Sequence, residues 1–477
     1  MIGWIILGVI GVFIIVLLVR AARFVPKQEA PIQKTKVYTN REKIVNDFVN
    51  MIQCKTVSNR DESLVDWSEF ERFEKLLKES FPLIHEKCSF QKIGKTGLLY
   101  KLAGESSEAP CVCMAHYDVV PVEEDGWDKP AFEGIIEDNV IWGRGTLDTK
   151  STLCAVLEAA EQLLAEGYQP KNDLYFSFSG EEEIDGPSCK DIVDYLELQG
   201  IKPAFVLDEG GAIVENVFPG VDRECALIGI SEKGSVNMSF SMESSGGHAS
   251  TPPVHTILGQ LSQAVARIEK HPFKKQFTKP VRLMFDTLGR HTPFLYRVVF
   301  ANMWCFMPLL DLVSKKIGGE INAMFRTTVA VTKMEGSKAY NVLPVKASFG
   351  INMRLLGEDT IDSATQYLTK TIANEKIKHT FINGANPSKC SDIDCEAWET
   401  LKKAIRQTWP EALVSPYLMM ACSDSRHYCK ITDKVYRFSP MRLSKEERAM
   451  IHGNNERIPV ETLVKTVEFY IRLLKML

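Results

Sequence analysis

Short apolar runs that end in acidic or histidine residues constrain the fold of this chain more than any other feature. Cys111–His116, Leu174–Ser179 and Ala204–Leu207 are strand-like runs of this kind, and each ends at or just before such residues. Helical periodicity separates them over Ser151–Glu166 and Asp191–Gln199. Strands that alternate with helices predict an α/β fold with a mostly parallel sheet, whose functional side chains gather at the carboxyl ends of the strands.

The middle of the chain has a different pattern. Val236–Met242 alternates like a half-buried strand, Leu258–Glu269 is helical, and Arg326–Lys333 and Lys346–Arg354 are again strand-like. This order predicts a small α+β domain inserted into the larger one. We therefore expect a catalytic domain in two parts, over 41–233 and 357–477, interrupted by a lid domain over 234–356.

One stretch inside the expected lid, 283–317, is unusually apolar and contains the run FLYRVVFANMWCFMPLLDLV. The charged residues Arg297, Asp311 and Lys315 argue against a membrane span there. Two interpretations stay open. The stretch is either a buried helical hairpin, or a surface that faces lipid or binds an acyl chain.

The first 19 residues contain no charged side chain. A helix of that length reaches about 28 Å, close to the thickness of a bilayer core. Residues 1–19 therefore predict an uncleaved single-pass transmembrane anchor, and the polar residues 20–40 a linker. Basic residues follow the apolar run, which predicts that the catalytic domain lies on the cytoplasmic side.

Composition excludes several functional classes. The chain has 477 residues, 57 Lys and Arg against 61 Asp and Glu, and a formal charge of −4. This balance, without a long basic block beyond the N-terminal region, gives no reason to expect nucleic acid as a partner. Twelve cysteines in a chain of this length are too sparse for a disulfide scaffold.

The acids and histidines at the strand ends indicate a metal centre. His116 and Asp118 follow one strand, Glu181, Glu182 and Glu183 follow the next, and Asp208 and Glu209 follow a third. Like charges at the end of a buried strand repel each other unless a cation holds them. Imidazole and carboxylate ligands together suit zinc, with manganese or cobalt as lesser possibilities.

Together, these segments give the chain a specific resemblance. The motifs MAHYDVVP, GRGTLDTK, GEEE, LDEGG, GGHAS, YNVLP, SDSRH and IHG occur in this order along the chain. In this the chain resembles the two-zinc exopeptidases and amidohydrolases that include carboxypeptidase S, glutamate carboxypeptidase and aminoacylase. It is most similar to the carboxypeptidase S branch, which contains the N-fatty-acyl-amino-acid synthase/hydrolase. The resemblance covers nearly all of residues 41–477.

The resemblance implies a role for each matching residue. His116 and Asp208 would hold one zinc ion, Glu183 and His452 the other, and Asp148 would bridge both. Glu182 would be the general base, although the triple Glu leaves a register with Glu181 as base and Glu182 as ligand. Asp118 would orient His116, and His248 would stabilise the oxyanion, reaching across to the partner's site in dimeric members. Asn341 and Arg354, together with Ser423 and Asp424, would bind substrate.

The resemblance also implies the reaction, which is hydrolysis of an amide bond beside a free carboxylate. Long-chain N-acyl amino acids are the substrate class that we expect, and a homodimer is possible. A dipeptidase or carboxypeptidase with the same mechanism is the first alternative, and an inactive membrane-tethered binding protein is the second. The bulky segment Ala421-Cys422-Ser423 departs from the glycine-rich loop of the family near the substrate carboxylate.

Overall fold

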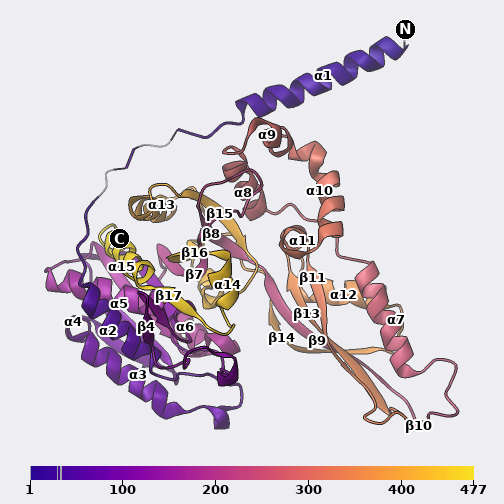
Figure 1. Ribbon diagram of the computed structural model, residues 1–477, viewed down its shortest axis with the longest axis horizontal. Helices are drawn as coiled ribbons and strands as arrows, with labels where there is room; N and C mark the ends of the chain where they lie inside the picture. The colour runs from indigo at the N-terminus through magenta and orange to yellow at the C-terminus, as the bar shows by residue number, and fades with distance from the viewer. Residues whose placement is uncertain (1, 29–30, 33–34) are drawn as a thin grey trace.

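The computed structural model describes residues 2–28, 31–32 and 35–477 (Figure 1). The molecule has three parts, which are an N-terminal helix, a large α/β domain and a smaller α+β domain. Most functional residues expected from the sequence lie on the large domain.

The large domain is built on a mixed sheet of eight strands in the order β1-β2-β6-β3-β7-β16-β8-β15. The pairs β6–β3, β3–β7 and β7–β16 at its centre are parallel, as the strand–helix alternation predicts, whereas β1 and β2 at one edge are antiparallel. The strands are β1 Ser89–Ile93, β2 Gly97–Leu102, β3 Ser106–His116, β6 Asn172–Ser179, β7 Phe205–Val214, β8 Cys225–Glu232, β15 Leu413–Met419 and β16 Val435–Arg442.

Helices cover both faces of this sheet. Alternate residues of β3 point to opposite sides. Cys111, Cys113 and Ala115 belong to the core under α5, and Val112 and Met114 to the core under α6. Helix α5 is buried on nearly all sides because α2, α4 and α15 pack around it. The helices of this domain are α2 Arg41–Ile52, α3 Trp67–Ser80, α4 Pro82–Lys87, α5 Lys150–Ala165, α6 Ser188–Leu198, α13 Glu396–Thr408, α14 Lys445–Met450 and α15 Val460–Leu474.

Short elements complete the rim of the large domain. A three-stranded sheet in the order β17-β5-β4 joins Arg457–Pro459, Val140–Trp142 and Ile135–Glu137. The short 3-10 helices η3 (Glu182–Ile184) and η4 (Asp424–Lys430) carry two of the expected site segments.

The smaller domain is a four-stranded antiparallel sheet in the order β11-β13-β9-β14, with two helices packed on it. The elements are β9 Gly234–Glu243, β11 Thr328–Glu335, β13 Lys346–Leu355, β14 Lys378–Ala385, α7 Ile257–Lys270 and α12 Ile361–Ile372. A two-stranded ribbon of β10 (Gly247–His248) and β12 (Val342–Leu343) lies at its far tip (Figure 1).

The boundaries of this smaller domain differ from those expected. Strand β14 pairs with β9 and α12 shares the core of β9 and β13, so the unit continues past 356. Conversely, α8 (Lys279–Gly289) contributes Val281, Met284 and Phe285 to the core of the large domain. Both differences arise from contacts between segments far apart in sequence, which local periodicity does not predict.

The apolar stretch 283–317 is neither fully buried nor one straight helix. Helix α8 is packed into the core, while α9 (Phe294–Phe300) and α10 (Met303–Ile317) follow it with a bend of 94° between them. Helix α11 (Gly319–Phe325) then returns the chain to β11. Helices α9 and α10 keep several large apolar side chains exposed.

The N-terminal helix α1 (Ile2–Arg23) projects away from the rest of the molecule (Figure 1). Within the described residues it is the one unbroken helix long and apolar enough to cross a membrane. A membrane span and a signal sequence share this pattern. Its carboxyl-terminal part contacts α9, where Leu17 and Ala21 are buried.

Candidate metal centre and active site

Five of the expected site segments meet at one edge of the large sheet. His116 is the last residue of β3, Glu182 and Glu183 lie just beyond β6, and Asp208 and Glu209 lie in β7. Because β6, β3 and β7 are parallel neighbours, their carboxyl ends open at the same edge. The loop before α5 adds Asp148, and the loop after α14 adds His452.

Asp148 lies between the two imidazoles. Its Oδ1 is 2.9 Å from Nε2 of His116, and its Oδ2 is 2.9 Å from Nε2 of His452. His452 Nε2 is also 3.0 Å from Oε2 of Glu183. A carboxylate whose two oxygens face different histidines has the geometry of a ligand shared by two cations.

The other side of His116 is occupied by Glu209 and not by Asp208. Glu209 Oε1 is 3.4 Å from His116 Nε2, and both residues have ligand atoms grouped with those of Glu182. Asp208 instead accepts a hydrogen bond from the backbone N–H of Ser425 at 3.0 Å.

An irregularity in β7 explains this orientation. Asp208 pairs with Arg437 of β16, but the next pair is Gly211 with Phe438, so Glu209 and Gly210 are extra residues in the ladder. Gly210 has a φ of 138°, which side-chain-bearing residues rarely adopt. Such a bulge redirects side chains next to active sites. The sequence places two acids side by side here but does not indicate which of them faces the metal centre.

The acids of this cluster are electrostatically strained without a cation. Burial raises the pKa of Glu209 to about 8 and raises the pKa of Glu182 well above its usual value. Burial also raises the pKa of Glu183, against the hydrogen bond from His452. Hydrogen bonds to Asp148 and Glu183 raise the pKa of His452 to about 10. These raised pKa values reflect a surplus of negative charge in the cluster, which divalent cations would neutralise.

Asp118 connects the histidine with the triple-Glu turn. Its backbone oxygen is 3.0 Å from Nδ1 of His116, an arrangement that leaves Nε2 free to face a cation. Its carboxylate accepts the backbone N–H groups of Glu182 and Glu183, both at 3.1 Å. The hydroxyl of Ser58 donates to the same carboxylate at 2.7 Å. Asp118 is thus a positioning residue for His116 and for the turn.

A buried carboxylate that the sequence analysis missed supports the Asp148 loop. Glu456 accepts hydrogen bonds from the backbone N–H of Gly145, Leu147 and Asp148 at 3.1, 2.7 and 3.2 Å. The guanidinium of Arg144 donates to it at 2.7 Å. Glu456 lies only four residues after His452, in a loop rather than at a strand end, which is why the strand-end pattern does not include it.

The expected substrate residues fall into two groups. Arg354, at the end of β13, has its Nη1 3.4 Å from Sγ of Cys422 and so faces the loop that departs from the family pattern. Ser423 and Asp424 are buried and point inward, Ser423 to the hydroxyl of Ser425 and Asp424 to that of Ser179. Their contribution is to the shape of this loop.

His248 and Asn341 are not brought to the metal cluster within one chain. Both are exposed at the tip of the smaller domain, where the backbone oxygen of Asn341 accepts the N–H of Ala249 at 3.0 Å. In Figure 1 the strand β10, which carries His248, lies at the far end of that domain from the large sheet.

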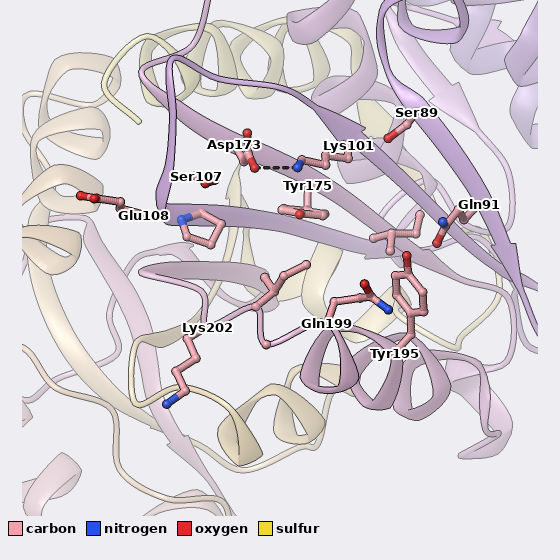
Figure 2. Close-up of a pocket in the computed structure, with 14 residues that line it drawn as sticks. Ser89, Gln91, Lys101, Ser107, Glu108, Asp173, Tyr175, Tyr195, Gln199 and Lys202 are labelled. Carbon is pink, nitrogen blue, oxygen red and sulfur yellow. Dashed lines mark ion pairs between the residues drawn. The ribbon is translucent and has the colours of Figure 1, made fainter.

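A hollow elsewhere on the large domain is distinct from this site. It has a volume of about 640 Å³ and is lined by Ser107 and Glu108 at the start of β3, whereas His116 is at the end of that strand. Figure 2 shows Tyr195 of α6, and Gln199 just after that helix, facing the strands that carry Lys101 and Tyr175. Its charged pair, Lys101 and Asp173, is already bonded at 2.7 Å. The hollow therefore lies at the opposite end of the sheet from the metal centre.

Comparisons with known proteins agree with this geometry. Residues 112–476 match the peptidase family M20/M25/M40. The chain is 35% identical over 414 residues to the probable carboxypeptidase S-like 2 of Dictyostelium discoideum, which covers 85% of this chain and 79% of that one. It is 34% identical over 443 residues to the N-fatty-acyl-amino acid synthase/hydrolase PM20D1.1 of Danio rerio, covering 91% and 86%.

The fold comparison gives the same result. The M20 family metallo-carboxypeptidase Sso-CP2 of Sulfolobus solfataricus superposes with a TM-score of 0.68 at 16% identity, covering 91% of this chain and 98% of that one. The family is metal-dependent, commonly with a dinuclear centre, which suits the cluster around Asp148. The chain therefore belongs to the peptidase family M20/M25/M40 and is a metallohydrolase.

Proposed function

We propose that this protein hydrolyses the amide bond of N-acyl amino acids, with long acyl chains preferred, by a two-zinc mechanism. The observation that carries the proposal is the Asp148 carboxylate between two histidines, with the half-buried Glu182 beside His116. The substrate class is supported by relatives named as N-fatty-acyl-amino acid synthase/hydrolases, which cover most of this chain.

The proposed ligands form two sets that share Asp148. His116, Asp148 and Glu209 would hold one zinc ion, and Asp148, Glu183 and His452 the other. Glu209 replaces Asp208 in the first set because it is the acid that faces His116. Bound zinc ions would polarise the amide carbonyl and lower the pKa of a bound water toward about 7, and manganese or cobalt could serve the same purpose.

Glu182 is the proposed general base. Burial raises its pKa well above the usual value, which favours a group that can hold a proton taken from water. It would accept a proton from the attacking water and deliver it to the nitrogen of the leaving amino acid. The backbone N–H of Glu182 bonded to Asp118 holds this turn in register with the ligands.

Arg354 is the proposed partner of the substrate carboxylate. A guanidinium can bind a carboxylate through two parallel hydrogen bonds, which fixes the amide bond relative to the metal centre. Burial, and after it the positive charge of Arg354, lowers the pKa of Lys233 to about 7, so Arg354 supplies the more persistent positive charge of the two.

His248 and Asn341 are proposed to act from a second copy of the chain. Their exposed position at the tip of the smaller domain supports a homodimer in which each tip reaches the partner's metal centre. There, His248 would donate a hydrogen bond to the developing oxyanion. Helix α1 is proposed as a membrane anchor, with the basic residues after it on the cytoplasmic side.

The proposal is tested with the purified full chain in detergent micelles, zinc-loaded or chelated. N-oleoyl-phenylalanine, N-acetyl-phenylalanine and short dipeptides are offered in parallel. Metal-dependent cleavage that favours the oleoyl substrate supports the proposal. Cleavage of dipeptides alone would identify a peptidase with the same mechanism, and metal binding without turnover would identify a binding protein.

Three matched variants test the register of the triple Glu. Glu182→Gln should keep both metal ions and lose kcat, whereas Glu183→Gln should lose metal. Glu181→Gln is the control, because Glu181 bonds to the Thr96 hydroxyl at 3.0 Å instead of to the histidines. Loss of activity in Glu181→Gln with Glu182→Gln active would reverse the assignment.

A further inference from the structure

Helices α9 and α10 keep several large apolar side chains exposed to solvent. Leu295, Trp304, Leu309 and Leu312 are its most exposed large side chains, and we call these four the α9–α10 surface. Leu295 is 78% exposed and Leu312 65% exposed. Soluble proteins rarely leave apolar side chains clustered in this way unless something covers them.

This surface is continuous with α1. The ring of Phe13 in α1 meets Trp304 edge to face, with centroids 5.9 Å apart. Near the other end of the contact, the guanidinium of Arg290 lies 4.5 Å from the Phe24 ring. Figure 1 shows α1 leaving the molecule beside α9 and α10. An apolar helix and an apolar surface thus lie side by side.

Polar contacts fix α1 relative to the surface. Arg20 donates to Oδ1 of Asn302 and to the backbone oxygen of Ala301, both at 2.9 Å. Asn302 in turn donates to the backbone oxygen of Leu17 at 3.1 Å. These contacts join the carboxyl-terminal part of α1 to the break between α9 and α10.

The lengths of the helices favour a position at the membrane interface. Helix α9 has 7 residues and α10 has 15, and with a bend of 94° between them they do not form one straight span. At about 1.5 Å per residue, α10 reaches only about 23 Å, less than the bilayer core of about 30 Å. Apolar helices of this kind lie in the plane of the interface.

The charges at the edge of the surface suit lipid headgroups. Lys315 and Lys316 close α10, and Arg20 and Arg23 close α1. The acid of α10, Asp311, is bound by Arg326 and Lys315 and does not repel anionic lipid. Basic residues that border an apolar surface add electrostatic attraction to a bilayer.

We propose that the α9–α10 surface inserts into the lipid bilayer next to α1, so that the protein contacts the membrane at two places and the large domain is held close to it. The membrane is the favoured occupant because the surface is continuous with a helix whose apolar stretch is almost wholly exposed. Unlike the anchor alone, a second contact restricts how the large domain can tilt.

Lipid crosslinking with the full chain tests this proposal. A photoreactive phenylalanine analogue replaces Leu312 or, separately, Leu295 in protein reconstituted into nanodiscs with anionic lipid. Leu198 on α6 is the matched control, because it is a leucine with 84% exposure outside the α9–α10 surface. An inserted side chain meets lipid continuously, so lipid adducts at Leu312 and Leu295 should exceed those at Leu198 by at least about tenfold.

Two results would overturn the proposal. Lipid adducts at Leu312 no more abundant than at Leu198 would show that the surface faces water. Adducts with a second copy of the chain would identify it as a protein interface. The readout does not depend on catalysis, so the proposal can fail while the proposed activity holds, and the reverse. The unfolding temperature of each labelled protein serves as the control for folding.

Discussion

Replacing Glu456 with glutamine tests how the metal centre is supported from behind. The Glu456 carboxylate is buried and accepts four hydrogen bonds, one from Arg144 and three from the backbone of the loop that ends at Asp148. Burial raises the pKa of Glu456, while Arg144 and the N–H of Leu147 oppose that rise. In Glu456→Gln the amide keeps one acceptor oxygen, but its NH₂ group faces N–H donors.

The magnitude follows from these contacts. Removing one partner of a buried ion pair leaves the other charge uncompensated, which costs about 3–5 kcal/mol. Losing acceptors for about two of the four donors, at about 1.5–3 kcal/mol for each bond to a charged group, gives a similar sum. Because the loop also carries Asp148, metal affinity should fall about 10–100-fold, as for other residues that orient ligands.

Urea unfolding of the metal-loaded protein and a zinc titration with a competing chelator measure the two effects. The matched control is Glu461→Gln, since the ion pair of Glu461 with Arg41 is exposed and its loss should change stability by less than about 1 kcal/mol. If Glu456→Gln loses no more stability and no more metal affinity than Glu461→Gln, Glu456 does not support the Asp148 loop.

Three further predictions concern the same site. Ser58→Ala removes the hydroxyl bonded to Asp118 and should lower the free energy of unfolding by about 1 kcal/mol. The variant should also have a lower kcat with unchanged metal content. An unchanged kcat would mean that Asp118 is held in place without Ser58. Burial and Arg354 lower the pKa of Lys233 to about 7, so the unfolded chain binds more protons than the folded chain between about pH 7 and 10.5. Stability should therefore rise with pH in this range, and Lys233→Met should remove the rise in a pH series of unfolding curves. In the chelated protein, the pKa of Glu209 is raised to about 8 and that of His452 to about 10, so the folded chain binds more protons than the unfolded chain. Stability should therefore fall as pH rises from about 4.5 to 10, and zinc or Glu209→Gln should weaken this fall. A flat stability profile of the chelated protein would contradict the role of the cluster.

Much of the fold is encoded locally. The runs that end at His116 and Ser179 are strands, as predicted, because apolar β-favouring residues alternate there with helical segments. The parallel order of these strands then brings their ends together without further information. For that reason the sequence alone predicts where the candidate metal centre lies and most of the residues around it.

What the sequence does not encode locally depends on contacts between distant segments. Which of Asp208 and Glu209 faces His116 depends on the pairing of β7 with β16, a strand more than 200 residues later in the chain. Likewise, β14 joins the smaller domain through its pairing with β9. Glu456 was missed because its partners belong to a loop about 300 residues earlier. In each case the sequence shows the chemical type of the residue but not which distant residues it contacts in the folded chain.

The buried cations of the chain explain why the acid cluster needs ions from outside. Arg144 is paired with Glu456, and Arg437 with Glu232. Lys150 and Lys233 donate to backbone carbonyls and not to the acids of the cluster. Among the described residues, the remaining buried arginines, Arg326 and Arg472, pair with Asp311 and Glu468. These buried cations are therefore held by acids or carbonyls outside the cluster, and the carboxylates of Asp148, Glu183 and Glu209 stay available to divalent cations.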